Sequence, residues 1–160
     1  MNSYFSQLYL DILARIEGLI PDIKWIEQDF GQEANTKWRT AVAFPAALIN
    51  FPSAQYEGMA MGGQTAVVSV SVRLICATFS QSYNAAPDEV KAAALAYFEL
   101  EQQLVDALHG WQPGGDYTQP LMRTSAASDN NNNNGLRIRT LTFTTAYEEY
   151  LEDDDNYARI

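Results

Sequence analysis

Apolar residues recur every three or four positions near the start of the chain, which is the spacing of one face of a helix. The positions on this face are Phe5, Leu8, Ile12, Ile16 and Leu19. Ser3 can cap the first turn, and Gly18 and Pro21 follow where the apolar pattern stops. We therefore predict an amphipathic helix that begins after Ser3 and ends near Gly18.

A second stretch with helical spacing begins at Pro87, a residue suited to the first helical position. Asp88 and Glu89 follow in the first turn, where carboxylates complement the helix dipole. The predicted buried stripe consists of Val90, Ala93, Tyr97, Leu100, Leu104 and Leu108. Gly110 is a good C-terminal stop, so we predict a helix of about twenty residues that ends near Leu108.

Between these helices the apolar residues alternate with polar ones, which is typical of β-strands. Residues 66–79 show the clearest alternation, and the face predicted to meet the core carries Ala66, Val68, Val70, Val72, Leu74 and Cys76. Residues 23–27 predict a short strand. Residues 40–51 predict a bent strand, because Pro45 cannot donate a backbone hydrogen bond.

Glycine, proline and asparagine mark the connections between these elements. Residues 52–64 contain three glycines and are predicted to be a turn-rich connection. Residues 121–127 and 136–147 are predicted strands, and the Asn-Gly pair at the end of the asparagine run 130–134 predicts a hairpin between them.

The predicted order of elements is α-β-β-β-α-β-β. Strands grouped between two helices are typical of an α+β domain, here a largely antiparallel, curved sheet with two helices packed on it. We assign residues 1–147 to this single domain. Residues 148–160 are assigned to an acidic C-terminal tail, since six of the eight residues from Glu148 to Asp155 are acidic.

The net charge of −10 changes the functional picture more than the rest of the composition does. A general nucleic-acid binder needs clustered Lys and Arg, so this charge argues against one. Residues 1–147 hold 14 acids against 9 bases, and residues 148–160 hold 6 against 1, so each part contributes −5. The charge therefore leaves open a protein that surrounds DNA without gripping it.

Candidate catalytic and metal-binding chemistry is sparse. His109, the only histidine, is predicted to lie in the last turn of the second helix without a nucleophile motif. Cys76 is predicted to be a core residue, and residues 58–63 lack the lysine of a phosphate-binding loop. Residues 152–155 lack calcium-loop spacing, and a solvated tail is the favoured interpretation over metal binding. We expect no catalytic, cofactor-binding or metal-binding residues and no enzyme activity.

No secretory signal or membrane-spanning segment is predicted, because charged residues interrupt every long apolar stretch. We expect a protein that is made and used in the cytoplasm. Three Trp, nine Tyr and seven Phe fit an interaction protein better than an enzyme, because aromatic residues are enriched at subunit contacts. Candidate contacts with other subunits or partners are Arg73, Arg137, Arg139, Tyr147 and Tyr150.

Taken together, the chain resembles the tail terminators of long-tailed bacteriophages, also called tail completion or minor tail proteins. The resemblance rests on the order of elements: an N-terminal helix, the segment Phe44-Pro45 to Ile49, the long strand 67–79, the second helix, and the closing hairpin with Arg137, Arg139 and Phe143. It covers nearly the whole chain to Tyr147.

The resemblance implies a homo-oligomeric ring, typically a hexamer, that stops growth of the tail tube and docks the head connector. Its implied partners are other copies of itself, the tail tube protein and the head connector protein, and DNA passes through without specific binding. Its implied location is the virion tail, after assembly in the cytoplasm of a host bacterium. Two alternatives stay open: a head–tail connector or neck adaptor, and a small-molecule-binding module or enzyme that uses the sheet face around Arg73.

Overall fold

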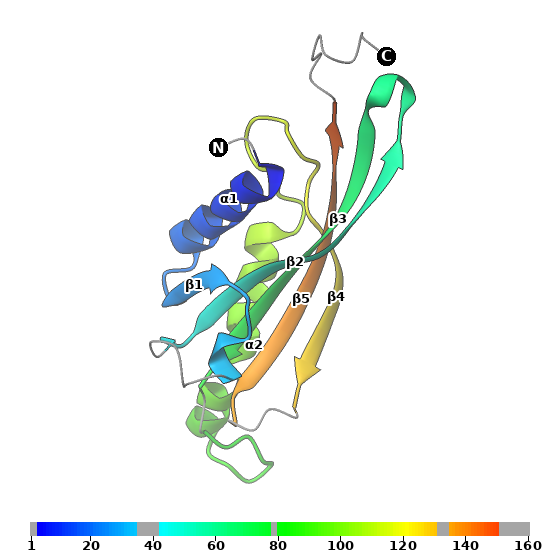
Figure 1. Cartoon of the computed structure of the whole chain (residues 1–160). Coiled ribbons are helices and arrows are strands. Elements are labelled where there is room, and N and C mark those ends of the chain that lie inside the picture. Colours follow the sequence, from blue (N-terminus) through cyan, green and yellow to red (C-terminus); the bar gives the residue numbers. More distant parts are fainter. Residues whose placement is uncertain (1–2, 35–41, 78–79, 131–134, 151–160) are drawn as a thin grey trace.

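A computed structural model describes residues 3–34, 42–77, 80–130 and 135–150 (Figure 1). The elements follow the predicted order α-β-β-β-α-β-β, so the single α+β domain is confirmed. In chain order they are α1 (Tyr4–Leu19), β1 (Trp25–Gln28), the short 3-10 helix η1 (Gln32–Ala34), β2 (Ala46–Gly58), the 3-10 helix η2 (Ala60–Gly62), β3 (Gln64–Cys76), α2 (Asp88–Leu108), β4 (Met122–Asp129) and β5 (Arg137–Glu149).

The five strands form one open, twisted sheet in the order β1-β2-β3-β5-β4 (Figure 1). β1 runs parallel to β2, and the other three pairs are antiparallel. β1 and β4 are therefore the two edges of the sheet. The predicted closing hairpin is confirmed, because β4 and β5 pair antiparallel on either side of the asparagine run, of which residues 131–134 lie outside the described residues.

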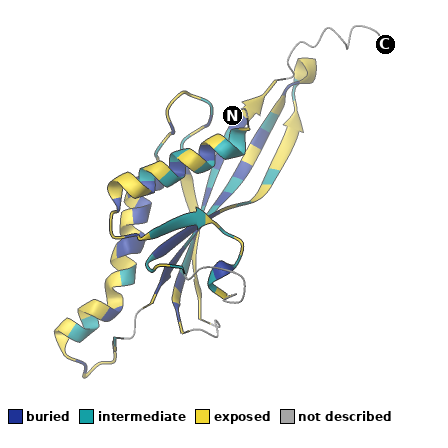
Figure 2. Cartoon of the chain, turned by 60° about the vertical axis from the view of Figure 1, so that its left-hand side comes forward, coloured by how far each residue is buried: buried dark blue, intermediate teal, exposed yellow. Residues whose placement is uncertain are grey.

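Both helices pack on the same face of the sheet, and the main core lies between them and β3 (Figure 2). The predicted core face of β3 is confirmed: all six of its residues are buried, namely Ala66, Val68, Val70, Val72, Leu74 and Cys76. From the helices, Leu8, Ile12 and Ile16 of α1 and Leu104 and Leu108 of α2 join this core. Strict alternation in β3 and helical spacing in α1 and α2 thus bury one face of each element.

The predicted turn-rich connection over residues 52–64 is wrong, because β2 continues to Gly58 and β3 begins at Gln64. Pro52 is tolerated in β2 because the ladder with β3 shifts between Asn50 and Ser53, and a bulge leaves one residue without a ladder partner. The turn itself is short, and the Met59 amide closes it by donating to the Gly63 carbonyl at 2.8 Å. The result is a long β2–β3 hairpin that projects from the body (Figure 1).

The N-terminal half of α2 departs from its predicted stripe. Ala94 is buried and Ala93 is exposed, while Leu95 and Phe98 are also exposed. Figure 2 shows the reason: this half of the helix reaches beyond the sheet, so it has no layer to pack against. Leu19, predicted on the apolar stripe of α1, is likewise exposed at the last residue of that helix.

β5 extends to Glu149, two residues into the segment assigned to the acidic tail. Glu148 and Glu149 pair with Thr65 and Gln64 of β3, at the base of the projecting hairpin. Residues 151–160, which hold the other acids of the predicted tail, lie outside the described residues.

Candidate functional site

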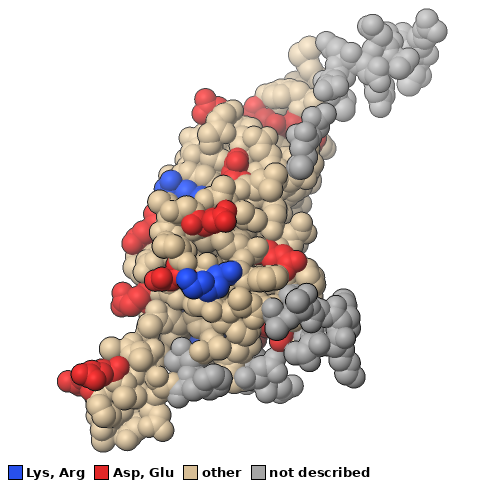
Figure 3. Space-filling model, turned by 90° about the vertical axis from the view of Figure 1, so that its left-hand side faces the viewer, with Lys and Arg blue, Asp and Glu red and all other residues tan. Residues whose placement is uncertain are grey.

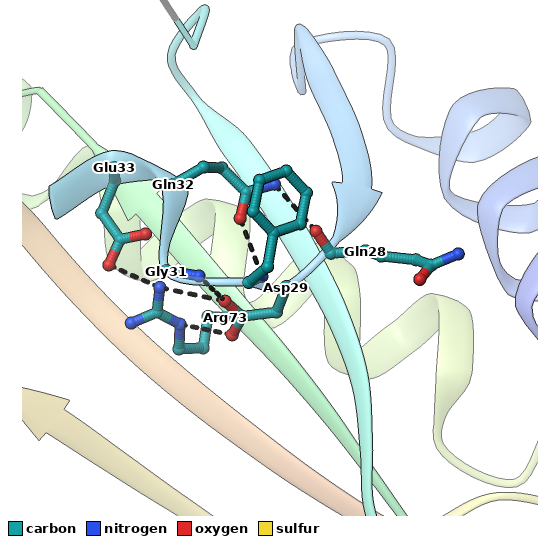
Figure 4. Close-up of polar contacts among 7 residues, drawn as sticks. Gln28, Asp29, Gly31, Gln32, Glu33 and Arg73 are labelled. Carbon is teal, nitrogen blue, oxygen red and sulfur yellow. Dashed lines mark hydrogen bonds and ion pairs between the residues drawn. The ribbon is translucent and has the colours of Figure 1, made fainter. Parts of the chain in front are cut away.

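Arg73 lies on the sheet face opposite the helices, where it is held by two acids of its own chain (Figure 4). Its Nε donates to Asp29 Oδ2 at 2.7 Å, and its Nη2 donates to Glu33 Oε1 at 2.5 Å. Burial disfavours the guanidinium charge, but hydrogen bonds and charge from Glu33 and Asp29 outweigh it and raise the pKa of Arg73. The Arg73 charge is therefore neutralised within the chain.

The segment that carries these acids is built by local hydrogen bonds. The Asp29 amide continues the β1–β2 ladder by donating to the Ile49 carbonyl at 2.8 Å. Gly31 then adopts a φ of 73°, which favours glycine, and its amide donates to Asp29 Oδ1 at 3.1 Å. Buried Gln32 donates to the Gln28 carbonyl at 2.8 Å (Figure 4). These contacts place the acids over Arg73.

Arg139 joins β5 to α2. Its Nε and Nη2 donate to the two carboxylate oxygens of Glu101 at 2.6 and 2.9 Å, and its Nη1 donates to Ser128 Oγ at 2.6 Å. The guanidinium also lies 5.4 Å from the centre of the Phe98 ring. Bidentate pairs of this kind fix geometry as well as adding energy. Arg139 thus locks the second helix onto the sheet, whereas Arg137 is exposed at the start of β5.

The Arg139–Glu101 pair gives a first prediction. Glu101→Gln is expected to lower the free energy of unfolding by about 1–3 kcal/mol, because it removes the charge from a bidentate, partly buried hydrogen bond. Glu99→Gln, at an exposed position of the same helix, should stay within about 0.5 kcal/mol of wild type. Chemical denaturation measures both, and equal values for the two variants would contradict the structural role of the pair.

Tyr147 is the centre of an aromatic cluster between α1 and the base of the hairpin. Its ring stacks on Tyr4 with centroids 3.6 Å apart, and it meets Phe5 edge-on. Its hydroxyl lies 3.1 Å from the Tyr56 hydroxyl. Burial and the neighbouring Tyr56 raise the pKa of Tyr147. Tyr150, three residues on, is exposed, and its hydroxyl donates to Glu148.

An apolar groove of about 490 Å³ lies between the N-terminal half of α1 and the middle of β2. Phe5, Tyr9, Leu10 and Phe51 form its apolar walls. Asp29 is the single charged residue in its lining, and its carboxylate is bound by Arg73. The volume falls in the range of roughly 300–1,000 Å³ found for ligand pockets. The groove therefore offers shape and aromatic surface with little net charge.

The projecting tip of the β2–β3 hairpin carries the most exposed apolar side chain among the described residues. Met61 is fully exposed at the turn. The five turn residues, Met59 to Gly63, carry no charge. An apolar, uncharged tip stands out on this acidic chain, whose α1 and β1 side shows spread acidic side chains and few basic ones (Figure 3).

The sheet face opposite the helices is lined mainly by small hydroxyl side chains along β3 and β5. Cross-strand pairs on this face include Ser69 with Thr144 and Ser71 with Thr142. Between these pairs and Arg73 with its partners, the described part of this face carries little free charge. Every residue of the neighbouring edge strand β4 is exposed. This face and edge leave open surface for contact with another subunit or partner.

The other candidate chemistry is placed as follows. Cys76 is buried in the core, as predicted, and burial raises the pKa of its thiol to about 11. His109 is the C-cap residue of α2, and its Nδ1 accepts a hydrogen bond from the Arg123 amide at 3.0 Å. Among the described residues no group of three or more metal-ligating side chains comes together. None of the described helices is long and apolar enough to cross a membrane.

Comparison with known proteins identifies the fold but no family. No family model matches the chain, and no curated protein does. A similar chain occurs in the solved structure of the virion of a native gene transfer agent (GTA) particle. The TM-score is 0.58 at 14% sequence identity, and the match covers 93% of this chain and 100% of that chain. The two chains therefore share one fold over nearly their whole length.

The sequence named Arg73, Arg139 and Tyr147 but missed what surrounds them. Asp29 and Glu33 were part of an assigned loop, and nothing in their spacing paired them with a strand residue far along the chain. The groove had a weak signal: Leu10 is an apolar residue off the buried stripe of α1 and is therefore expected to face outward. Arg73 and Arg139 are brought to their own acids, and the structure does not bring the five candidate residues together in one site.

Proposed function

We propose that this protein is a structural component of a phage-like virion, and that it acts without catalysis as a tail terminator. The observation that carries the proposal is the shared fold with a chain of a gene transfer agent virion, because the match spans both chains almost completely. In this role the protein forms a ring, typically a hexamer, that caps the tail tube and joins it to the head connector.

The size and charge of the chain support such a ring. A compact chain of this length has a radius of about 19–20 Å. Six spheres of equal size in contact leave a central hole of the same radius, which is wide enough for duplex DNA. Residues 1–147 carry a net charge of −5, and a surface with this excess of acids repels phosphates, so DNA passes without being held.

The proposal predicts that the purified full-length chain forms rings. Size exclusion with light scattering should show a single multiple of the monomer mass that grows with protein concentration, and negative-stain images should show rings with a central hole. A monomer at every concentration and ionic strength would contradict the ring. Moderate salt should favour assembly, because it screens the repulsion between acidic copies.

Partner binding separates the two virion roles. A tail terminator should bind to the end of purified tail tubes and stop their elongation, whereas a neck adaptor should bind the head connector and leave tube growth unchanged. Sedimentation of the chain with each partner distinguishes these results. Binding to neither partner would contradict the head–tail junction as its place.

A further inference from the structure

The projecting hairpin and the α1–β2 groove are two uncharged apolar surfaces on a strongly acidic chain. The hairpin tip exposes Met61 completely. The groove is walled by Phe5, Tyr9, Leu10 and Phe51. Each surface leaves apolar area in water that contact with a partner would remove.

The two surfaces match in chemistry. Methionine is unbranched and adapts to irregular gaps, and its sulfur makes favourable contacts with aromatic rings. Three of the four apolar walls of the groove are aromatic, namely Phe5, Tyr9 and Phe51. A methionine side chain is therefore a suitable occupant for this groove.

The groove cannot be filled by the tip of its own chain. Phe51, in the groove, and Gly58, at the base of the turn, are separated by roughly 23 Å of strand at ~3.3 Å per residue. β3 holds this part of β2 through continuous pairing from Ser53 to Gly58 and is itself paired with β5. The tip is thus fixed at a distance from the groove, and a second molecule has to supply the occupant.

Charge favours another copy of the same chain as that molecule. Two copies, each with a net charge of −10, repel each other over most of their surfaces. The tip carries no charge, and the carboxylate of Asp29 in the groove is already bound by Arg73. Contact between tip and groove therefore brings no unpaired acids together.

Adjacent to the groove, β2 also has an unused edge. The β1–β2 ladder ends at the pair Gln28–Ile49, and from Asn50 to Gly58 no described strand pairs with β2 on that side. Backbone groups of an incoming hairpin can hydrogen-bond to such an edge. The apolar walls and the free edge are thus side by side.

We propose that the Met61 tip of one copy inserts into the α1–β2 groove of the next copy. This inference rests on the proposed function, because it describes the contact that joins neighbouring subunits of the ring. Each copy has one tip and one groove at different places, so the contact is head-to-tail and closes into a ring when the rotation allows it. Met61 and the groove are then buried in the assembly.

Pairwise disulfide trapping tests this contact. A tagged Met61→Cys chain is mixed with an untagged Leu10→Cys chain under assembly conditions and mild oxidation. The expected product is a covalent heterodimer of one tagged and one untagged chain. The native Cys76 is buried with a raised thiol pKa, so it stays protonated and does not compete.

Leu95→Cys is the matched control for Leu10→Cys. Both are helical leucines of similar exposure, 44% and 47%, but Leu95 lies on α2 outside the groove. The Met61→Cys and Leu10→Cys pair should give at least tenfold more heterodimer than the Met61→Cys and Leu95→Cys pair. Met61→Asp should raise the concentration needed for assembly at least tenfold, while Met61→Leu should leave it near wild type.

The outcomes separate this contact from the ring itself. Rings with equal trapping of both pairs, or rings unaffected by Met61→Asp, would overturn the contact and leave the proposed function standing. A wild-type chain that forms no oligomer in light scattering would overturn the ring and the contact together. Selective trapping in an open filament would support the contact and contradict the closed ring.

Discussion

Arg73→Met is expected to lower the free energy of unfolding by about 3 kcal/mol. The substitution leaves the carboxylates of Asp29 and Glu33 close together without their cation, and both side chains are largely buried. Removing one partner of a buried ion pair costs about 3–5 kcal/mol, and the low end applies because 20% of the Arg73 side chain is exposed. The melting temperature should fall by about 6–12 °C.

Two further variants show whether the loss comes from the unpaired acids. Arg123→Met removes an exposed arginine on the edge strand β4 and should change stability by less than about 0.5 kcal/mol. Adding Asp29→Asn and Glu33→Gln to Arg73→Met removes both stranded charges and should restore part of the lost stability. A triple variant that is less stable than Arg73→Met alone would show that the cost has another source.

The elements that follow from local pattern were predictable from the sequence. The core face of β3 and the helices α1 and α2 follow from periodicity, because each element buries one face against a single layer. The course of β2 past Pro52 was not predictable in this way. Its pairing with β3 is a tertiary contact that accommodates the proline at a bulge, and this overrides the local signal for a turn.

The candidate contact residues show the same division. The type and position of Arg73 on the polar face of its strand were read from alternation, but its partners come from a loop 40 and 44 positions away. Arg137 and Arg139 share a face of β5, yet Glu101 of α2 reaches only the second of them. Such pairings depend on how helix and sheet pack, and no local pattern in a single sequence encodes that.

The groove and the hairpin tip depend on packing in a further way. Leu10 and Met61 were visible as apolar residues outside the predicted core pattern. Their use as a surface depends on where β1 stops pairing with β2 and on how far the hairpin projects. Both lengths are set by strand pairing between distant segments. A single sequence therefore suggests the exposed residues but not the site that they form.

Alkaline solution is expected to unfold this protein through three tyrosines, Tyr4, Tyr117 and Tyr147. Burial raises the pKa of each above its ordinary value of 10, and Asp11, which accepts a hydrogen bond from the Tyr117 hydroxyl, adds to the effect at Tyr117. In the unfolded chain these hydroxyls lose their protons near pH 10, whereas in the folded chain they keep them.

The direction of the pH effect follows from proton counting. Above about pH 10 the unfolded state binds fewer protons than the folded state, so stability is complete below that pH and falls as pH rises. Each tyrosine that keeps its proton lowers the free energy of unfolding by up to about 1.4 kcal/mol per pH unit. Urea unfolding at several values between about pH 8 and pH 11 should show a steep loss above pH 10.

The three tyrosines must be separated from the effect of net charge, which also grows with pH. Tyr117→Phe removes the hydrogen bond to Asp11 and is expected to cost about 1 kcal/mol at neutral pH, yet it should flatten the loss above pH 10. Tyr83→Phe changes an exposed tyrosine before α2 and should retain the wild-type pH dependence. Because both variants remove one phenol from the chain, only burial of the hydroxyl distinguishes them, and identical slopes would contradict this account of alkaline unfolding.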